Sequence, residues 1–194
     1  MTDPDEIGHA LAAVAQAFAS MAVQWAIGGS VASAAHGEPR ATNDVDVIAL
    51  LTEQQARAFT QHLGASFYAD ADAAADAARR HSSFNVIDNR SFIKIDVFVP
   101  PPGALGAGQL DRVQMLQVLP GAGELPILGP EDVVLQKLRW HQLGGGVSDR
   151  QWRDIVSVLR IARDTIDSAY LDGVASQNGL EHALARARED AGEP

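Results

Sequence analysis

Two strongly β-forming segments of this chain carry aspartates in their interior. The segment DVDVIAL at 44–50 contains Asp44 and Asp46, and the segment IKIDVFV at 93–99 contains Asp96. Their β-branched content and length predict that both segments are strands. A charge in an apolar sheet costs free energy unless it is paired or bound to a cation. These three aspartates therefore constrain the fold and the chemistry of the chain more than any other feature.

Side-chain alternation decides where these carboxylates point. Asp44 and Asp46 share one face of their strand, and Asp96 shares a face with Lys94, which would offset carboxylate repulsion. If the two strands are neighbours, three carboxylates converge and repel one another unless they are protonated or bridged by a metal ion. Oxygen ligands suit Mg²⁺ or Mn²⁺, and a pair of such ions supports phosphoryl or nucleotidyl transfer. Alternatively, Asp44 is a turn residue and the other two aspartates face solvent.

A Gly-Gly-Ser turn precedes the first of these strands. Gly28, Gly29 and Ser30 follow a predicted strand at 23–27 and lead into a predicted short helix at 30–36. Backbone N–H groups at such a helix start form an anion site, to which the serine hydroxyl would add a donor. The turn matches neither the P-loop nor the G-x-G-x-x-G pattern. A tight strand–helix turn with a serine cap is the alternative.

The rest of the chain predicts a mixed sheet with helices, followed by a helical tail. A hairpin is expected from 83–88 and 91–100, and short strands at 112–119 and 124–128. Residues 69–80 read as a helix that could serve as a lid. The other predicted helices span 5–21, 52–63 with Thr52 as the cap, 130–143, 149–163 with a Ser148/Gln151 capping box, and the tail from 165.

Composition excludes several classes of protein. The 194 residues carry a net charge of −10, which argues against broad binding to a nucleic-acid backbone, although six of the 15 basic residues gather between 137 and 163. No apolar run approaches the ~18–20 residues of a membrane span. The chain has no cysteine, which excludes disulfides and thiolate metal sites and fits a cytoplasmic protein.

The Gly-Gly-Ser turn, the Asp-Val-Asp strand and the third aspartate together resemble the polymerase β-type nucleotidyltransferase superfamily. The similarity extends to its small bacterial members, such as AbiEii-type toxins and related uncharacterised nucleotidyltransferases. The resemblance implies an α/β (α+β) fold, in which a nucleotidyltransferase core at 1–129 carries a C-terminal helical region at 130–194 packed on it. The motif residues that carry it are Gly28, Gly29, Ser30, His36, Gly37, Arg40, Thr42, Asp44, Val45, Asp46, Lys94, Ile95 and Asp96.

The resemblance also implies residue roles. A nucleoside triphosphate would be the substrate, Mg²⁺ or Mn²⁺ the cofactor, and Asp96 would help to deprotonate the acceptor hydroxyl. The helices at 130–163 resemble the helical part of the same enzymes, where a lysine and a later aspartate assist. The resemblance thus implies nucleotide binding by Gly28, Gly29, Ser30, Arg40, Lys137 and Asp154, and catalysis and metal binding by Asp44, Asp46 and Asp96.

Simpler interpretations exist for several of these side chains. Arg40 contacts a phosphate or pairs with Asp44 or Glu38. Lys137 binds a phosphate or extends past the edge of the core into solvent. Asp154 enters the cleft or pairs with Arg150 one turn away, which is the favoured interpretation. His36 is expected to pack and hydrogen-bond rather than act as a base, and Trp140 and Trp152 are expected in the core.

These features predict an enzyme that transfers a nucleotide to a hydroxyl of an RNA, a protein or a small molecule. It would be a toxin with an antitoxin partner or a resistance-type enzyme, without a membrane partner. The alternatives are a non-catalytic nucleotide-binding or scaffold protein of the same fold, and a metal-dependent phosphohydrolase or nuclease. The Gly-Gly-Ser turn and the absence of metal-spaced histidines weigh against the last of these.

Overall fold

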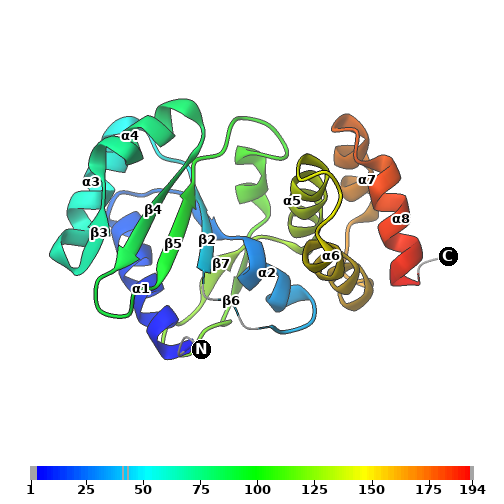
Figure 1. The fold of residues 1–194 in the computed structure, drawn as a ribbon, viewed down its shortest axis with the longest axis horizontal. Coiled ribbons are helices and arrows are strands. Elements are labelled where there is room, and N and C mark those ends of the chain that lie inside the picture. The colour runs from blue at the N-terminus through cyan, green and yellow to red at the C-terminus, as the bar shows by residue number, and fades with distance from the viewer. Residues whose placement is uncertain (1–3, 41, 43, 193–194) are drawn as a thin grey trace.

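A seven-stranded mixed sheet organises the chain (Figure 1). The computed structural model describes residues 4–40, 42 and 44–192. The strand order is β3-β4-β5-β2-β1-β7-β6, with β2 parallel to β5, β1 parallel to β7 and the other neighbours antiparallel. The strands are β1 (Trp25–Ile27), β2 (Asp44–Ala49), β3 (Phe67–Ala69), β4 (Ser83–Asp88), β5 (Lys94–Phe98), β6 (Gln114–Leu116) and β7 (Leu125–Ile127).

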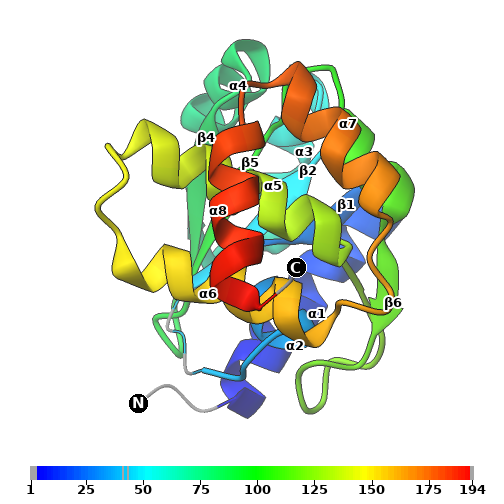
Figure 2. The same ribbon diagram turned by 90° about the vertical axis from the view of Figure 1, so that its right-hand side faces the viewer.

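Helices lie on both sides of this sheet. In Figure 1, α1, α3 and α4 lie on one side, and α2, α5 and α6 on the other with α7 and α8 beyond them. Figure 2 looks onto α8, which lies across this second group. The helices are α1 (Pro4–Ser20), α2 (Gly29–His36), α3 (Glu53–Leu63), α4 (Ala71–Arg80), α5 (Pro130–Leu143), α6 (Asp149–Ile161), α7 (Ser168–Gln177) and α8 (Glu181–Ala191), with short 3₁₀ turns η1 (Gly64–Ser66) and η2 (Ala107–Arg112).

Local signals set the helix boundaries. Thr52 and Gln55 form the reciprocal capping box that starts α3. Ser148 accepts from the backbone N–H of Gln151 at the start of α6, which ends at Ile161 rather than at 163. The segment at 69–80 is not a lid over the aspartates, because α4 packs on α3 and β4 on the opposite side of the sheet.

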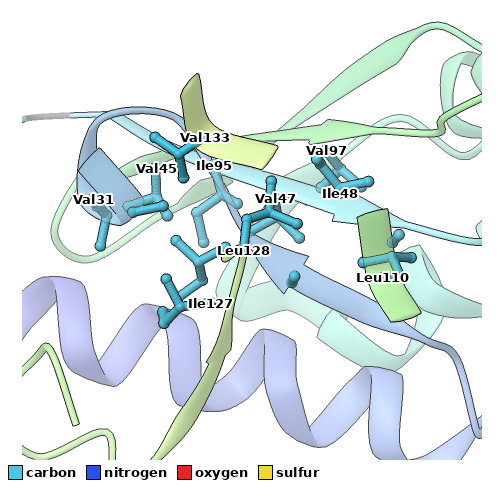
Figure 3. Close-up of a cluster of buried hydrophobic side chains, with 14 of the residues drawn as sticks. Val31, Val45, Val47, Ile48, Ile95, Val97, Leu110, Ile127, Leu128 and Val133 are labelled. Atoms are coloured by element: carbon cyan, nitrogen blue, oxygen red, sulfur yellow. The ribbon is translucent and has the colours of Figure 1, made fainter. Parts of the chain in front are cut away.

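The main core lies on the sheet face toward α1 and α3. Val45 and Val47 of β2 and Ile95 and Val97 of β5 are fully buried there (Figure 3). Their neighbours on the opposite face include the aspartates, so the alternation expected from the sequence holds in both strands. Phe18, Trp25, Phe59 and Phe84 form a chain of ring contacts in this core.

The expected mixed sheet with flanking helices and a helical C-terminal part is therefore confirmed. Its division into regions 1–129 and 130–194 stays a prediction, and residues 1–3, 41, 43, 193 and 194 of those ranges lie outside the described part of the chain. Within that described part, no helix combines the length and the apolar character that crossing a bilayer requires.

Candidate active site

The strands β2 and β5 bring the predicted carboxylates together. They are adjacent and parallel, and their register places Asp46 beside Asp96 and Asp44 beside Lys94. Asp44 is exposed, whereas Asp46 and Asp96 are half-buried. The expected convergence of three carboxylates on one patch of the sheet is thus present, on the side where α2 and α5 lie.

The Gly-Gly-Ser turn lies directly against Asp46. Gly28 donates its backbone N–H to the backbone carbonyl of Asp46 at 2.9 Å. The backbone N–H of Ser30 donates to the Asp46 carboxylate, so the positive end of α2 already faces an anion. Burial nevertheless raises the pKa of Asp46, and the neighbouring charges of Asp96 and Asp44 raise it further.

Gly29 is required at this turn by its conformation and by its surroundings. Its φ of +54° is one that side-chain-bearing residues rarely adopt. A Cβ atom there would lie 1.7 Å from Oδ2 of Asp46, far inside van der Waals contact. The close approach of the turn to the carboxylate therefore depends on glycine.

A chain of hydroxyl contacts joins the turn to the start of β2. The Ser30 hydroxyl donates to Oγ1 of Thr42 at 2.8 Å, and the Thr42 hydroxyl donates to the backbone carbonyl of Asp44 at 2.9 Å. Thr42 belongs to the motif pattern, but no role was assigned to it from the sequence. Its place two residues before the aspartate pair is the only signal that could have suggested one.

Lys94 neutralises Asp96, as its place on the same strand face predicts. Its ammonium lies 2.8 Å from Oδ2 of Asp96. The hydrogen bond to this carboxylate raises the pKa of Lys94, and the charges of Asp44 and Asp46 act in the same direction. Lys94 thus offsets part of the repulsion within the carboxylate patch.

A second charged cluster lies between the loop after α2 and the helices α5 and α6. The guanidinium of Arg40 binds both carboxylate oxygens of Asp154 at 3.0 and 2.9 Å, and the ammonium of Lys137 lies 2.8 Å from the same carboxylate. Burial alone would raise the pKa of Asp154, but the hydrogen bonds from Arg40 and Lys137 outweigh it and lower the pKa.

These contacts correct three simpler interpretations. Arg40 pairs with Asp154 rather than with Asp44 or Glu38. The favoured pairing of Asp154 with Arg150 is wrong, since Arg40 and Lys137 hold that carboxylate. Lys137 does not extend into solvent, because it is 9% exposed.

Lys137 also connects the two clusters electrostatically. Its positive charge acts against the raised pKa of Asp46 on β2 while its ammonium is bound to Asp154 on α6. Nη1 of Arg40 is buried and has no hydrogen-bond partner among the described residues. Arg40 therefore keeps one unused, buried donor within this second cluster.

The donor set of the patch suits a hard divalent cation. Asp44, Asp46 and Asp96 supply only carboxylate oxygens, and their mutual repulsion is the kind that a cation relieves. As they stand, the histidine, aspartate and glutamate side chains of the described part of the chain include no group of three arranged to hold a metal ion. Asp96 is paired with Lys94 instead.

The structure also shows where His36, Trp152 and Trp140 lie, the three other residues whose placement was expected from the sequence. Nε2 of His36 lies 2.8 Å from the carbonyl oxygen of Leu128, and burial lowers the pKa of this histidine, as expected for a packing residue. Trp152 is half-buried and donates its indole N–H to Asp190 at 2.8 Å. The expectation that Trp140 lies in the core is wrong, because its side chain is 53% exposed.

Comparison with known proteins agrees with this arrangement at the level of the fold. No family model matches the chain, and no curated protein matches its sequence. Among solved structures, an antigenic nucleotidyltransferase-like protein from Paracoccidioides brasiliensis is 18% identical with a TM-score of 0.58, over 97% of this chain and 94% of that one.

An antibiotic-resistance factor and an antibiotic adenylyltransferase also have a similar architecture. The antibiotic-resistance factor ANT(2'')-Ia is 11% identical with a TM-score of 0.60, over 96% of this chain and 98% of that one. The lincosamide antibiotic adenylyltransferase LnuA, solved with lincomycin bound, is 15% identical with a TM-score of 0.53, over 82% and 98% of the two chains. The chain therefore has the fold of these nucleotidyltransferase-like structures, as the resemblance in its sequence implies.

Proposed function

We propose that this protein is a metal-dependent nucleotidyltransferase that moves a nucleoside monophosphate from a nucleoside triphosphate to an acceptor hydroxyl. The observation that carries the proposal is the register of β2 and β5, which sets Asp46 beside Asp96 with the Gly-Gly-Ser turn against them. A triphosphate at the start of α2 would have its phosphates next to these carboxylates.

In the reaction, the acceptor oxygen attacks the α-phosphorus and the bond to the bridging oxygen of the β-phosphate breaks, so pyrophosphate leaves. Asp96 takes the proton of the acceptor hydroxyl. The turn from Gly28 to Ser30 and the unused donor of Arg40 orient the triphosphate, and Lys137 contributes positive charge behind it.

Asp44, Asp46 and Asp96 would hold Mg²⁺ or Mn²⁺, which would supply positive charge for the attacking and leaving oxygens. For this to happen, Lys94 has to leave Asp96, because both cations need the same carboxylate. We propose Asp154 as the anchor that fixes Arg40 and Lys137 in position rather than as a ligand of the nucleotide.

A non-catalytic nucleotide-binding protein is the second candidate. The Lys94–Asp96 ion pair favours it, because Lys94 already neutralises one of the three carboxylates that a metal ion would need. A role as the toxin of a toxin–antitoxin pair is compatible with either candidate. A small DNA-binding antitoxin encoded beside the gene would favour that role.

Thermal melting with each of the four nucleoside triphosphates, with and without Mg²⁺, tests the proposal. We expect a rise in melting temperature that needs both the metal and the nucleotide and is lost in Asp44→Ala/Asp46→Ala. Release of pyrophosphate from a screened acceptor then separates the enzyme from the non-catalytic binder. A shift that survives the double substitution would contradict the assigned site.

A further inference from the structure

On the side of the sheet that carries the aspartates, side chains of β4 are left exposed to solvent. On β4, Phe84 and Val86 point into the core and are buried, whereas Ser83 and Asn85 point the other way and are exposed. The register with β5 places Asn85 directly beside Asp96 and Ser83 beside Phe98. The carboxylate patch therefore continues outward onto an open, polar strip of sheet.

A tryptophan borders this strip from the helical side. Trp140 on α5 is 53% exposed, and its ring lies 6.4 Å from that of Phe98, centroid to centroid. Phe98 is two residues beyond Asp96 on the same face of β5. Its position matters because Trp140 and Phe98 together place two adjacent aromatic rings at the edge of a polar strip and next to a candidate catalytic carboxylate.

We propose that Ser83, Asn85, Phe98 and Trp140 form the acceptor shelf of this enzyme, and that the acceptor is a small, uncharged molecule built on a hydroxylated ring. The inference rests on the proposed nucleotidyl transfer and identifies the second substrate of that same site. A nucleotide at the Gly-Gly-Ser turn approaches Asp96 from β2, so an acceptor approaches it from β4.

The chemistry of the shelf determines this class of acceptor. Trp140 and Phe98 offer flat apolar surfaces for the face of a ring. The amide of Asn85 offers a donor and an acceptor to ring hydroxyls, and the Ser83 hydroxyl does the same. One hydroxyl of a ring placed there would reach Asp96, the residue to which we assign proton removal.

Charge argues against a nucleic-acid acceptor on this shelf. Its four residues are uncharged, and Lys94, the cation that β5 places beside them, is already paired with Asp96. Binding of an RNA strand depends on cations that neutralise its phosphates. The net charge of −10 points in the same direction.

Fluorine NMR on protein labelled with fluorotryptophan tests the shelf without any nucleotide. The chain has three tryptophans, so Trp140→Phe assigns the signal, while Trp25 and Trp152 serve as internal controls. The probes are methyl glucoside, methyl galactoside and inositol, with an adenosine tetraribonucleotide for comparison. We expect the Trp140 signal alone to shift, and to saturate with a Kd on the order of 10 mM or below.

A matched pair of variants separates binding from folding. We expect Asn85→Ala to weaken the saturating probe about tenfold. Gln114→Ala, at an exposed amide on the distant edge strand β6, should leave its affinity unchanged. The shelf assignment is overturned if none of the ring probes shifts Trp140, if Asn85→Ala has no effect, or if the tetraribonucleotide shifts Trp140 instead. Failure of the proposed transferase would appear separately, as the absence of the metal-dependent nucleotide shift in melting.

Discussion

Asp46 and Asp154 are two carboxylates under the influence of the same cation, Lys137, yet their pKa values move in opposite directions. The pKa of Asp154 is lowered, because Arg40 and Lys137 both donate hydrogen bonds to it. The pKa of Asp46 is raised, because burial and the charges of Asp96 and Asp44 outweigh Lys137 and the Ser30 N–H. One carboxylate is fully compensated by the protein and the other is not.

This difference separates a structural role from a ligand-binding role. A compensated charge joins two parts of the chain and gains nothing from a further cation. An under-compensated carboxylate lowers stability, and such sites persist where a ligand supplies the missing charge. We therefore assign Asp154 to positioning and Asp46 to function.

The largest expected effect is on activity at Asp46. Asp46→Asn keeps the shape of the side chain and removes its charge, so we expect nucleotidyl transfer to fall by about a thousandfold or more. The melting temperature should stay the same or rise, because repulsion with Asp96 is relieved. Asp72→Asn, at an exposed aspartate on α4, is the control for both measurements. Activity that survives Asp46→Asn would contradict the assignment of Asp46 to function.

The second effect is on stability at Asp154. Asp154→Ala leaves the buried ammonium of Lys137 without its partner, and we expect the free energy of unfolding in urea to fall by about 3 kcal/mol. Adding Lys137→Met should recover part of that loss, because the unpaired buried charge is then gone. If Asp154→Ala is as stable as Asp72→Ala, the carboxylate does not join the two parts of the chain.

Gly29 tests whether the turn positions Asp46. Gly29→Ala combines an unfavourable φ of +54° with a Cβ atom that would overlap the Asp46 carboxylate. We expect a loss of about 1–3 kcal/mol in the free energy of unfolding together with a loss of metal-dependent nucleotide binding. Gly64→Ala is the matched control, since Gly64 has a φ of +59° but a Cβ atom there would meet nothing within 4 Å. Equal behaviour of the two variants would mean that strain alone explains the effect.

The carboxylate patch was largely predictable from the sequence, whereas the ion pairs around Asp154 were not. Asp44, Asp46 and Asp96 are recognisable because strand alternation is local and their apolar neighbours are adjacent in sequence. The pairing of Arg40 with Asp154 joins residues 114 positions apart, and no spacing rule reaches that far. Helical spacing suggested Arg150 as the partner of Asp154, but in the folded chain Asp154 binds Arg40 instead.

Trp140 illustrates a second limit of prediction from the sequence. Helical periodicity beside apolar neighbours suggested the core, but periodicity does not show where the neighbouring sheet stops being covered. The exposed strip of β4 exists because α2, on this side of the sheet, packs on β2, and α5 and α6 pack on α2, which only the assembled fold reveals. The residues that we assign to the acceptor shelf consequently had no local signal.

The two carboxylates should also give stability opposite dependences on pH. Because the folded pKa of Asp46 lies above its usual 3.8, the wild type should gain stability relative to Asp46→Asn as the pH falls toward that value. Because the folded pKa of Asp154 lies below 3.8, its contribution is fully present above that value and disappears as the pH falls through the lowered pKa. Urea midpoints of wild type, Asp46→Asn and Asp154→Asn across this range measure both slopes. Parallel curves for the two variants would contradict the comparison.

The smallest effect on stability is expected at Lys94, whose main influence should be on ligand binding by the carboxylate patch. Its ion pair with Asp96 is 39% exposed on the lysine side, so Lys94→Gln should change the free energy of unfolding by less than about 1 kcal/mol. The same substitution frees Asp96, and we expect a larger stabilisation by Mg²⁺ and nucleotide together than in the wild type, measured by thermal melting. A smaller stabilisation would mean that Lys94 moves to the bound phosphates rather than merely leaving Asp96. Lys94 would then belong with the nucleotide-binding residues, and the carboxylate patch would be less deficient in positive charge than Asp46 alone suggests.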